Sequence, residues 1–252
     1  MSTSLTRPKL PSLSSRSITL TTTNDRYQTT IEELTTKYQT PNKVSRIIGL
    51  SDATGSMANI WDSTRRHITE MINRMSALGS YELKWVAYRD YSEDDKLIES
   101  SQWETGASNL LSFINTINCY GGMDWEEAVE KALEVAANDS KATCVILIGD
   151  APPHPERDYL QQAYRLAHLK RPVFSFVVGQ APETLKVFSE ISRITQGTCS
   201  PLKSADDLLD AVVLTAAHDM GGKPLIDQYL TSHAKQLSST SKSYAEKLLL
   251  LE

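Results

Sequence analysis

Three oxygen-bearing side chains alternate in one short stretch of the chain. Asp52, Thr54 and Ser56 belong to the segment IIGLSDATGSM (47–57), in which an apolar run ends at an aspartate and passes into a glycine-containing turn. The alternation lets one carboxylate and two hydroxyls face the same point beyond the end of the apolar run. Ligand sets made only of oxygen suit hard cations such as Mg²⁺, and not Zn²⁺ or copper. We therefore predict a divalent-cation site at this turn.

Two further acids are candidates for the same site. Asp150 follows the apolar run 142–148 and a glycine, so it repeats the pattern of a strand end, a tight turn and an acid. If the two apolar runs are neighbouring strands, Asp52 and Asp150 converge at one end of the sheet. Asp124 follows a Gly-Gly pair that permits a sharp turn, and it could supply a third carboxylate from the side. The predicted metal ligands are Asp52, Thr54, Ser56, Asp124 and Asp150.

Strands and helices must alternate along the chain to hold these residues. Apolar runs and period-two alternation predict strands over 44–50, 81–88, 97–103, 142–148, 173–178 and 198–202. Apolar residues three to four apart predict helices over 57–78, 108–118, 156–169, 182–195 and 205–220, with another helix capped by Asp124. This order predicts the α/β class: a doubly wound, mostly parallel sheet flanked by helices.

The two ends of the chain differ in composition from the α/β region. Residues 1–25 are rich in Ser and Thr and contain no acid before Asp25, so we predict a disordered tail. Organelle transit peptides share this composition, and that alternative stays open. We predict a short helix and linker over 26–42, the α/β domain over 43–222, and a polar, helical C-terminal extension over 223–252 that begins at a boundary of low stability.

Composition limits the functions that the chain can have. Its 252 residues are 40% hydrophobic and 23% charged, as in a globular protein, and the net charge is −5. A negative net charge offers no footprint for nucleic acid or for an anionic membrane surface. No apolar run approaches the length of a membrane span. Cys119, Cys144 and Cys199 are far apart in sequence, so we predict reduced thiols and a cytoplasmic location.

The motif DATGSM resembles the metal-ion-dependent adhesion site (MIDAS, Asp-x-Ser/Thr-x-Ser) of von Willebrand factor type A (VWA) domains. The segments VAYRDY, GGMDWEEAV and LIGDAPPH resemble the subtype found with α-kinase-type and bacterial intracellular members. The likeness extends from about Val44 to Met220. It implies a Rossmann-like fold and a domain that binds proteins and has no catalytic activity.

The resemblance also implies roles for the candidate ligands. Thr54 and Ser56 would bind the metal directly, and Asp52 and Asp150 directly or through water. The sixth position would be left for an aspartate or glutamate of a protein partner. The usual threonine of the second loop is absent here, and Asp124 is the candidate to replace it. Mg²⁺ is the expected ion, with Mn²⁺ and Ca²⁺ as alternatives.

Several of these residues also have simpler interpretations. Ser56 could cap the helix that follows, while Asp52 binds only main-chain amides. We expect Asp90 to form an ion pair with a neighbour such as Arg89 rather than to serve the site. His154 follows two prolines, and we expect an exposed loop histidine because no partner acid is spaced for it.

Two other functions compete with a binding module. An aspartate nucleophile at the crest of a sheet is typical of haloacid-dehalogenase-type phosphatases, which are Mg²⁺-dependent. Such enzymes need a second acid two residues later, and this chain has Thr54 there, so we predict no enzyme activity. Alternatively, the cation could serve only to rigidify a structural scaffold. The partner and the oligomeric state are not encoded in any motif.

Overall fold

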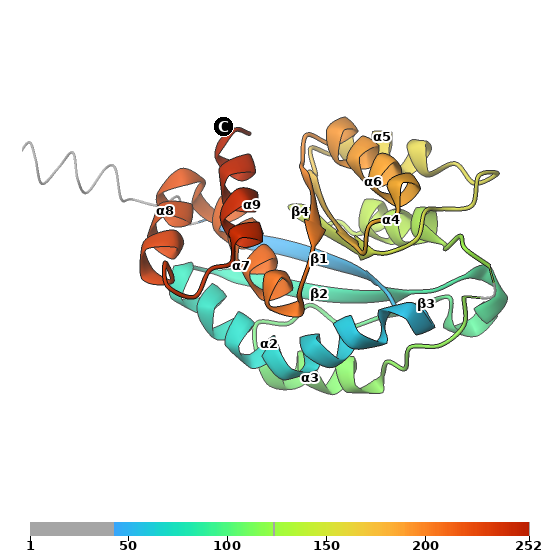
Figure 1. The fold of residues 1–252 in the computed structure, drawn as a ribbon, viewed down its shortest axis with the longest axis horizontal. Coiled ribbons are helices and arrows are strands. Elements are labelled where there is room, and N and C mark those ends of the chain that lie inside the picture. Colours follow the sequence, from blue (N-terminus) through green and yellow to red (C-terminus); the bar gives the residue numbers. More distant parts are fainter. Residues whose placement is uncertain (1–42, 123, 252) are drawn as a thin grey trace, which may run out of the picture. The chain divides into compact units, whose positions relative to one another are not determined.

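A six-stranded sheet forms the centre of the protein in the computed structural model, which describes residues 43–122 and 124–251 (Figure 1). Its strands are β1 (Ser45–Asp52), β2 (Tyr81–Tyr88), β3 (Ile98–Ser100), β4 (Cys144–Gly149), β5 (Val173–Val178) and β6 (Cys199–Leu202). They lie in the order β3-β2-β1-β4-β5-β6, and only β3 pairs in the antiparallel sense. The predicted α/β class and mostly parallel sheet are confirmed.

Helices cover both faces of this sheet (Figure 1). One layer contains α2 (Ala58–Leu78), α3 (Ala107–Thr116), α7 (Ala205–Gly221), α8 (Lys223–Ser232) and α9 (Ser239–Leu249). The other contains α4 (Val129–Asn138), α5 (Tyr159–His168) and α6 (Pro182–Ile194). Two short 3₁₀ helices, η1 (Gly55–Met57) and η2 (Tyr91–Lys96), lie in the loops after β1 and β2. The doubly wound arrangement follows from this two-sided cover.

The core consists of two clusters, one on each face of the sheet. In β4, Cys144, Ile146 and Ile148 belong to the cluster beneath α2 and α7, while Val145 and Leu147 belong to the cluster beneath α4 and α5. This division reflects the alternation of side chains along a strand. A strand covered on both faces must be apolar throughout. The apolar run 142–148 therefore predicted the position of β4 well.

The predicted elements and the observed ones differ in a few places. Strand β1 continues through Asp52, so this residue ends the strand, and β3 is only three residues long. Asp124 does not cap a helix: α4 begins at Val129, and the residue at its N-cap is Ala128, whose side chain accepts no hydrogen bond. The predicted tail (1–25) and the predicted helix and linker (26–42) lie outside the described residues.

The C-terminal segment 223–252 contains two helices that pack into the main core. Leu225, Ile226, Tyr229, Tyr244 and Leu248 are all buried beside residues of α2 and α7. Gly222, with φ of +61°, turns the chain between α7 and α8. The predicted boundary near Lys223 stays a prediction, for which a test is given below.

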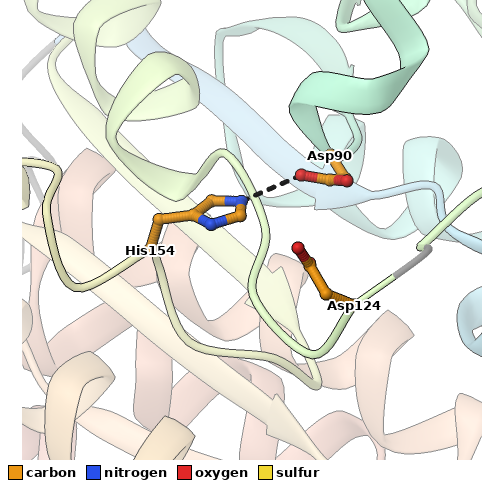
Figure 2. Close-up of side chains that lie close together, drawn as sticks. All are labelled: Asp90, Asp124 and His154. Carbon is orange, nitrogen blue, oxygen red and sulfur yellow. Dashed lines mark hydrogen bonds and ion pairs between the residues drawn. The ribbon is translucent and has the colours of Figure 1, made fainter.

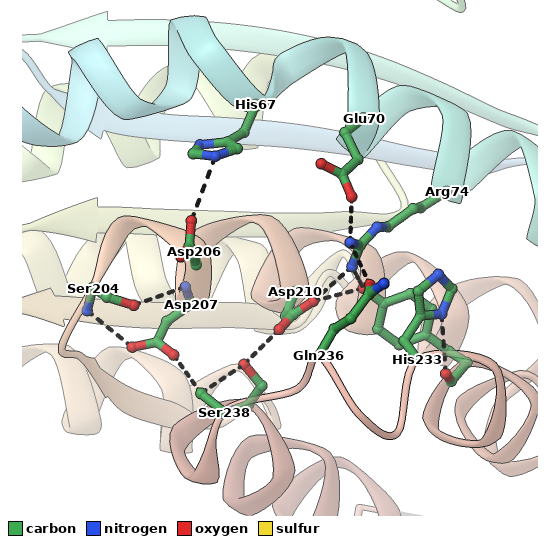
Figure 3. Close-up of polar contacts among 12 residues, drawn as sticks. His67, Glu70, Arg74, Ser204, Asp206, Asp207, Asp210, His233, Gln236 and Ser238 are labelled. Carbon is green, nitrogen blue, oxygen red and sulfur yellow. Dashed lines mark hydrogen bonds and ion pairs between the residues drawn. The ribbon is translucent and has the colours of Figure 1, made fainter.

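Polar contacts join these C-terminal helices to α2 and α7 (Figure 3). The carboxylate of Asp210 on α7 accepts hydrogen bonds from Tyr229 Oη at 2.6 Å and from Ser241 Oγ at 2.8 Å. Arg74 of α2 donates to Asp210 at 3.1 Å. Because Asp210 is only 6% exposed, these partners compensate a buried charge and fix how the four helices pack.

Within the described residues, no helix combines the length and the apolar character that a membrane span requires. Cys119, Cys144 and Cys199 are free thiols, and Cys144 is fully buried in β4.

Candidate metal centre

The two predicted acids Asp52 and Asp150 follow the carboxyl ends of adjacent parallel strands. Ser51 of β1 is paired with Ile148 of β4, so the next residues of both strands reach the same end of the sheet. Asp52 is completely buried, and the charge of Asp150 is close enough to raise the pKa of Asp52. The structure therefore brings together the two carboxylates that the sequence pattern associated.

Thr54 organises the turn after β1. Its amide and its hydroxyl both donate to Oδ1 of Asp52, each at 2.7 Å, and Ser56 Oγ lies 3.3 Å from Thr54 Oγ1. Ser56 does not cap α2, because the N-cap is Met57 and no side chain caps that end. The simpler interpretation of Ser56 is thus wrong. The two hydroxyls and the carboxylate are grouped as the alternating motif predicted.

An aromatic side chain fixes the end of β1 against α2. The indole Nε1 of Trp61 donates to the main-chain oxygen of Asp52 at 2.6 Å, and both residues are buried. This bond ties the first turns of α2 to the strand that carries the acid. The position of the Asp52 main chain is therefore set by the core rather than by solvent-exposed contacts.

A pocket of about 150 Å³ opens at this end of the sheet. Its lining includes Thr54, Ser56, Gly122, Asp124, Glu127 and Asp150. Four of the five predicted ligands thus line the pocket, and Asp52 lies beneath it as the hydrogen-bond acceptor of Thr54. A volume of this size admits an ion with several water molecules.

Gly122 permits the close approach of the loop that precedes α4. Its φ is +77°, and a Cβ at this position would lie 3.2 Å from Glu127 Oε1 and 3.4 Å from Thr54 Cβ. A glycine is the residue that adopts this conformation without strain. The Gly-Gly pair in the sequence therefore predicted the turn correctly, and the turn brings this loop against Thr54.

Main-chain hydrogen bonds join the loops around the pocket. The Ala53 amide donates to Tyr88 O at 2.8 Å, and the Ala128 amide donates to Arg89 O at 3.1 Å. The Glu127 amide donates to Pro152 O at 2.9 Å. The loops after β1, β2 and β4 and the loop before α4 thus form one connected framework.

Glu127 is a pocket residue that the sequence did not reveal. A helix capped by Asp124 would place Glu127 in its first turn, but α4 starts two residues later and the glutamate is 3% exposed. The apolar periodicity of α4 begins at Val129, and this signal could have placed the helix start correctly. The bridge between Glu127 and Pro153 depends on the tertiary fold and has no sequence signal.

Three buried carboxylate oxygens without hydrogen-bond partners in the described part of the chain show whether the residues of this site fit a cation. Asp52 Oδ2, Asp150 Oδ1 and Glu127 Oε2 are buried and accept no hydrogen bond from the described residues. Burial, with the charge of Asp150, raises the pKa of Asp52 to about 7, although hydrogen bonds from Thr54 oppose the shift. Burial and the charges of Asp52, Asp90 and Asp150 raise the pKa of Glu127 to about 9. A divalent cation supplies the positive charge that such a set requires, so the residues fit one.

His154 and Asp90 form a pair that was not expected. His154 Nε2 lies 2.9 Å from Asp90 Oδ1, and the two side chains are only 13% and 4% exposed. The expectation of an exposed loop histidine without a partner acid is wrong. Arg89 forms its ion pair with Glu99, at 2.8 Å, and not with Asp90. The pairing joins the loop after β2 to the loop after β4, which are distant in sequence.

Asp124 lies close to this pair as well as to the pocket. One ligand atom from each of Asp90, Asp124 and His154 lies within 4.8 Å of the other two (Figure 2). Burial alone would raise the pKa of Asp90, but hydrogen bonds from Ser92, His154 and main-chain amides lower it below 3.8. Asp90 is therefore ionised at neutral pH.

Comparison with known proteins identifies the fold. No family model matches the chain. The structure resembles a von Willebrand factor type A protein from Catenulispora acidiphila with a TM-score of 0.56 and 14% identity, over 71% of this chain and 43% of that one. The chain has a VWA fold. BatB, a conserved hypothetical protein from Bacteroides thetaiotaomicron, shares this VWA fold with a TM-score of 0.51 and 14% identity, over 77% of this chain and all of that chain.

A third structure with the VWA fold holds a metal. Proximal thread matrix protein 1 from the mussel byssus, with a zinc-occupied MIDAS motif, matches with a TM-score of 0.53 and 13% identity. The match covers 69% of this chain and 46% of that chain. At such identities the likeness concerns the fold alone.

One curated protein matches by sequence. A putative ariadne-like RING finger protein of Acanthamoeba polyphaga mimivirus is 32% identical over 108 residues, or 41% of this chain. The match spans 10% of the length of that relative.

Proposed function

We propose that this chain is a non-catalytic protein-binding module whose VWA domain binds one Mg²⁺ ion and, through it, an acidic residue of a partner. Asp52, Thr54, Ser56 and Asp150 would hold the ion, with Asp124 as the fifth ligand predicted by sequence. Mn²⁺ and Ca²⁺ are alternative ions. When bound, the ion supplies uncompensated positive charge that attracts a carboxylate. The proposal includes a cytoplasmic location, consistent with three separate free thiols.

One observation carries this proposal: buried carboxylate oxygens without partners lie beside two neutral hydroxyls at an open pocket. Asp52 Oδ2 and Asp150 Oδ1 have no hydrogen-bond donor among the described residues. Leaving buried polar atoms unpaired destabilises a fold, so a cluster of such atoms favours the binding of a cation that can pair with them. The hydroxyls of Thr54 and Ser56 add ligand atoms without adding charge.

A phosphatase of the haloacid-dehalogenase type is not favoured. Its general acid would stand at position 54, where Thr54 Oγ1 instead donates to Asp52. The Asp90–His154 pair has no serine, threonine or cysteine bonded to the histidine within the described residues. Among the described residues of the pocket, no acid stands two residues after Asp52 to act as the general acid of such a phosphatase.

The ion-binding step is tested by calorimetric titration of MgCl₂ and by melting curves with and without EDTA. Mg²⁺ should raise the melting temperature, because a ligand that binds only the folded state stabilises it, by about 2.7 kcal/mol at a hundredfold excess over Kd. The rise should persist in Thr54→Ser and be lost in Thr54→Val. Asp227→Ala, an exposed aspartate on α8, is the matched control and should behave as the wild type. An equal rise in Thr54→Val would contradict the site.

The binding step needs a separate experiment. Proteins retained on the immobilised chain in MgCl₂ should be released by EDTA and should not bind an Asp52→Ala bait. Retention of the same protein in MgCl₂, in EDTA and on the Asp52→Ala bait would show that binding does not depend on the metal. Turnover of a generic phosphoester that depends on Asp52 would instead support an enzyme.

A further inference from the structure

Asp90, Asp124 and His154 come from three separate loops and converge on one point (Figure 2). Asp90 follows β2, Asp124 precedes α4, and His154 lies in the loop after β4. Their ligand atoms are mutually within 4.8 Å, a spacing that one bound ion can span. We propose that these three residues form a second cation site, specific for transition metals such as Zn²⁺ and Mn²⁺ and separate from the oxygen-only site at Asp52.

The donor set distinguishes this site from its neighbour. An imidazole nitrogen is a poor ligand for Mg²⁺ but a good one for Zn²⁺, Co²⁺ and Mn²⁺. Two carboxylates and one histidine make three protein ligands, which leave further positions for water or for a group of another molecule. The Asp52 turn offers only oxygen atoms. The two sites therefore differ in the ion that they prefer: the oxygen-only set favours Mg²⁺, and the set with an imidazole favours Zn²⁺.

The surroundings of His154 suit metal binding through Nε2. A metal on Nε2 requires the ring proton on Nδ1, and the carboxylate of Glu156 lies 4.0 Å from Nδ1. The imidazole also packs edge-on against the ring of Tyr91, with ring centroids 5.5 Å apart. The contact with Tyr91 and the hydrogen bond to Asp90 leave the ring with Nε2 directed toward Asp90 (Figure 2).

A buried carboxylate next to Asp124 also favours a cation at this end of the sheet. Glu127 lines the same pocket as Asp124, it is 97% removed from solvent, and its Oε2 accepts no hydrogen bond. The charges of Asp90 and Asp124 are among those that act on this carboxylate. Asp90 and Asp124 thus bring two acids to His154, and among the described residues the histidine is the only basic side chain bonded to Asp90.

The second site gives Asp124 a role that differs from replacement of the missing threonine. Asp124 would belong with Asp90 and His154, while Asp52, Thr54, Ser56 and Asp150 would bind the first ion. Asp124 is the one residue that both proposals name, and Asp90 and His154 belong to the second site alone, so substitution of His154 tests the second site separately from the Mg²⁺ site.

The test is a calorimetric titration of the full chain with ZnCl₂ and with MnCl₂. The wild type should bind two Mn²⁺ ions, and His154→Ala and Asp52→Asn should each bind one. His154→Ala should weaken Zn²⁺ binding at least tenfold and leave the Mg²⁺-induced rise in melting temperature unchanged. His168→Ala, an exposed histidine on α5, should retain both ions. A single Mn²⁺ ion in the wild type, or Zn²⁺ affinity unchanged in His154→Ala, would overturn the proposal.

A measurement on the wild type covers the case in which His154→Ala fails to fold. The chain contains five histidines, so their imidazole ¹⁵N signals can be assigned. ZnCl₂ should shift the Nε2 signal of His154 at one equivalent, before those of the other four. An unchanged His154 signal at saturation would show that Zn²⁺ binds elsewhere and would also overturn the proposal. Loss of the Mg²⁺ effect alone would count against the Asp52 site and leave this one standing.

Discussion

Asp52 accepts both of its described side-chain hydrogen bonds on one oxygen, Oδ1, and both come from Thr54. The other oxygen, Oδ2, is buried without a partner. In the absence of a cation this carboxylate is therefore costly to ionise, and its pKa of about 7 reflects that cost.

We predict that Asp52→Asn has opposite effects with and without Mg²⁺. In EDTA at pH 8 the free energy of unfolding of the variant should exceed that of the wild type by at least about 1 kcal/mol, because the substitution removes a buried charge beside Asp150. The folded-state pKa is raised, so the destabilising effect of Asp52 is absent below pH 4 and grows as the pH rises toward 8. The gain should therefore shrink at pH 5, and in MgCl₂ the wild type should be the more stable protein. Chemical denaturation at both pH values measures these differences, and a variant less stable than the wild type in EDTA at pH 8 would contradict the prediction.

Gly122→Ala should destabilise both the fold and the metal site. The left-handed conformation costs a residue with a Cβ about 1–2 kcal/mol, and the methyl group would press on Glu127 Oε1. Gly55→Ala, in the turn between Thr54 and Ser56, is the matched control, because its Cβ would meet only Gly121 O at 3.7 Å. Denaturation and MgCl₂ titration of both variants compare the two glycines. Equal losses in both would show that the loop conformation is not the cause.

Asp139 should contribute to the loss of folding stability at low pH. Burial alone would raise its pKa, but hydrogen bonds from Lys141 N and Lys84, and the Lys84 charge, bring the pKa below 3.8. A lowered folded-state pKa stabilises the protein above pH 4, and this contribution is lost as the pH falls through the folded-state pKa. Asp139→Asn should cost about 1 kcal/mol at pH 7, since solvent partly screens the ion pair, and almost nothing near pH 2. Urea denaturation across this range measures the difference, and a pH-independent cost would contradict it.

The C-terminal helices should be needed for the stability of the whole domain. Leu248→Ala should cost about 2–5 kcal/mol, since this leucine on α9 is fully buried in the main core. Leu250→Ala, two residues later and 85% exposed, should change stability by less than about 0.5 kcal/mol.

Removal of residues 223–252 tests the predicted boundary directly. A boundary of low stability at Lys223, as predicted from the sequence, implies that the α/β body stays folded without this segment. The buried contacts of Tyr229 and Tyr244 lead us to expect a lower melting temperature and a less cooperative transition instead. A truncated chain that melts as sharply as the full chain would support the earlier prediction.

Sequence predicted the fold well where the signal is local. The apolar run of β4 and the periodic stripe of α2 each depend on residues adjacent in sequence, and both were located to within two residues. The convergence of Asp52 and Asp150 also followed from a general property of parallel sheets.

The missed features depend on contacts between distant loops. His154 and Asp90 are 64 residues apart, and no spacing rule links them. Glu127 was placed wrongly because Asp124 has the residue type of a helix cap, while the tertiary bond of the Glu127 amide to Pro152 delays the helix. The chain does not encode such long-range pairings in any short pattern.

The main-chain bonds that join the loops around the pocket have a thermodynamic consequence. Loops held by Ala53, Ala128 and Glu127 amides have little conformational entropy left to lose when another molecule docks. Association should then be limited by diffusion and orientation rather than by ordering of the loops. Outward side chains such as Trp125, which is 49% exposed, can be exchanged without altering the path of the backbone. If a partner docks at this end of the sheet as proposed, surface substitutions alone can change which partner is preferred.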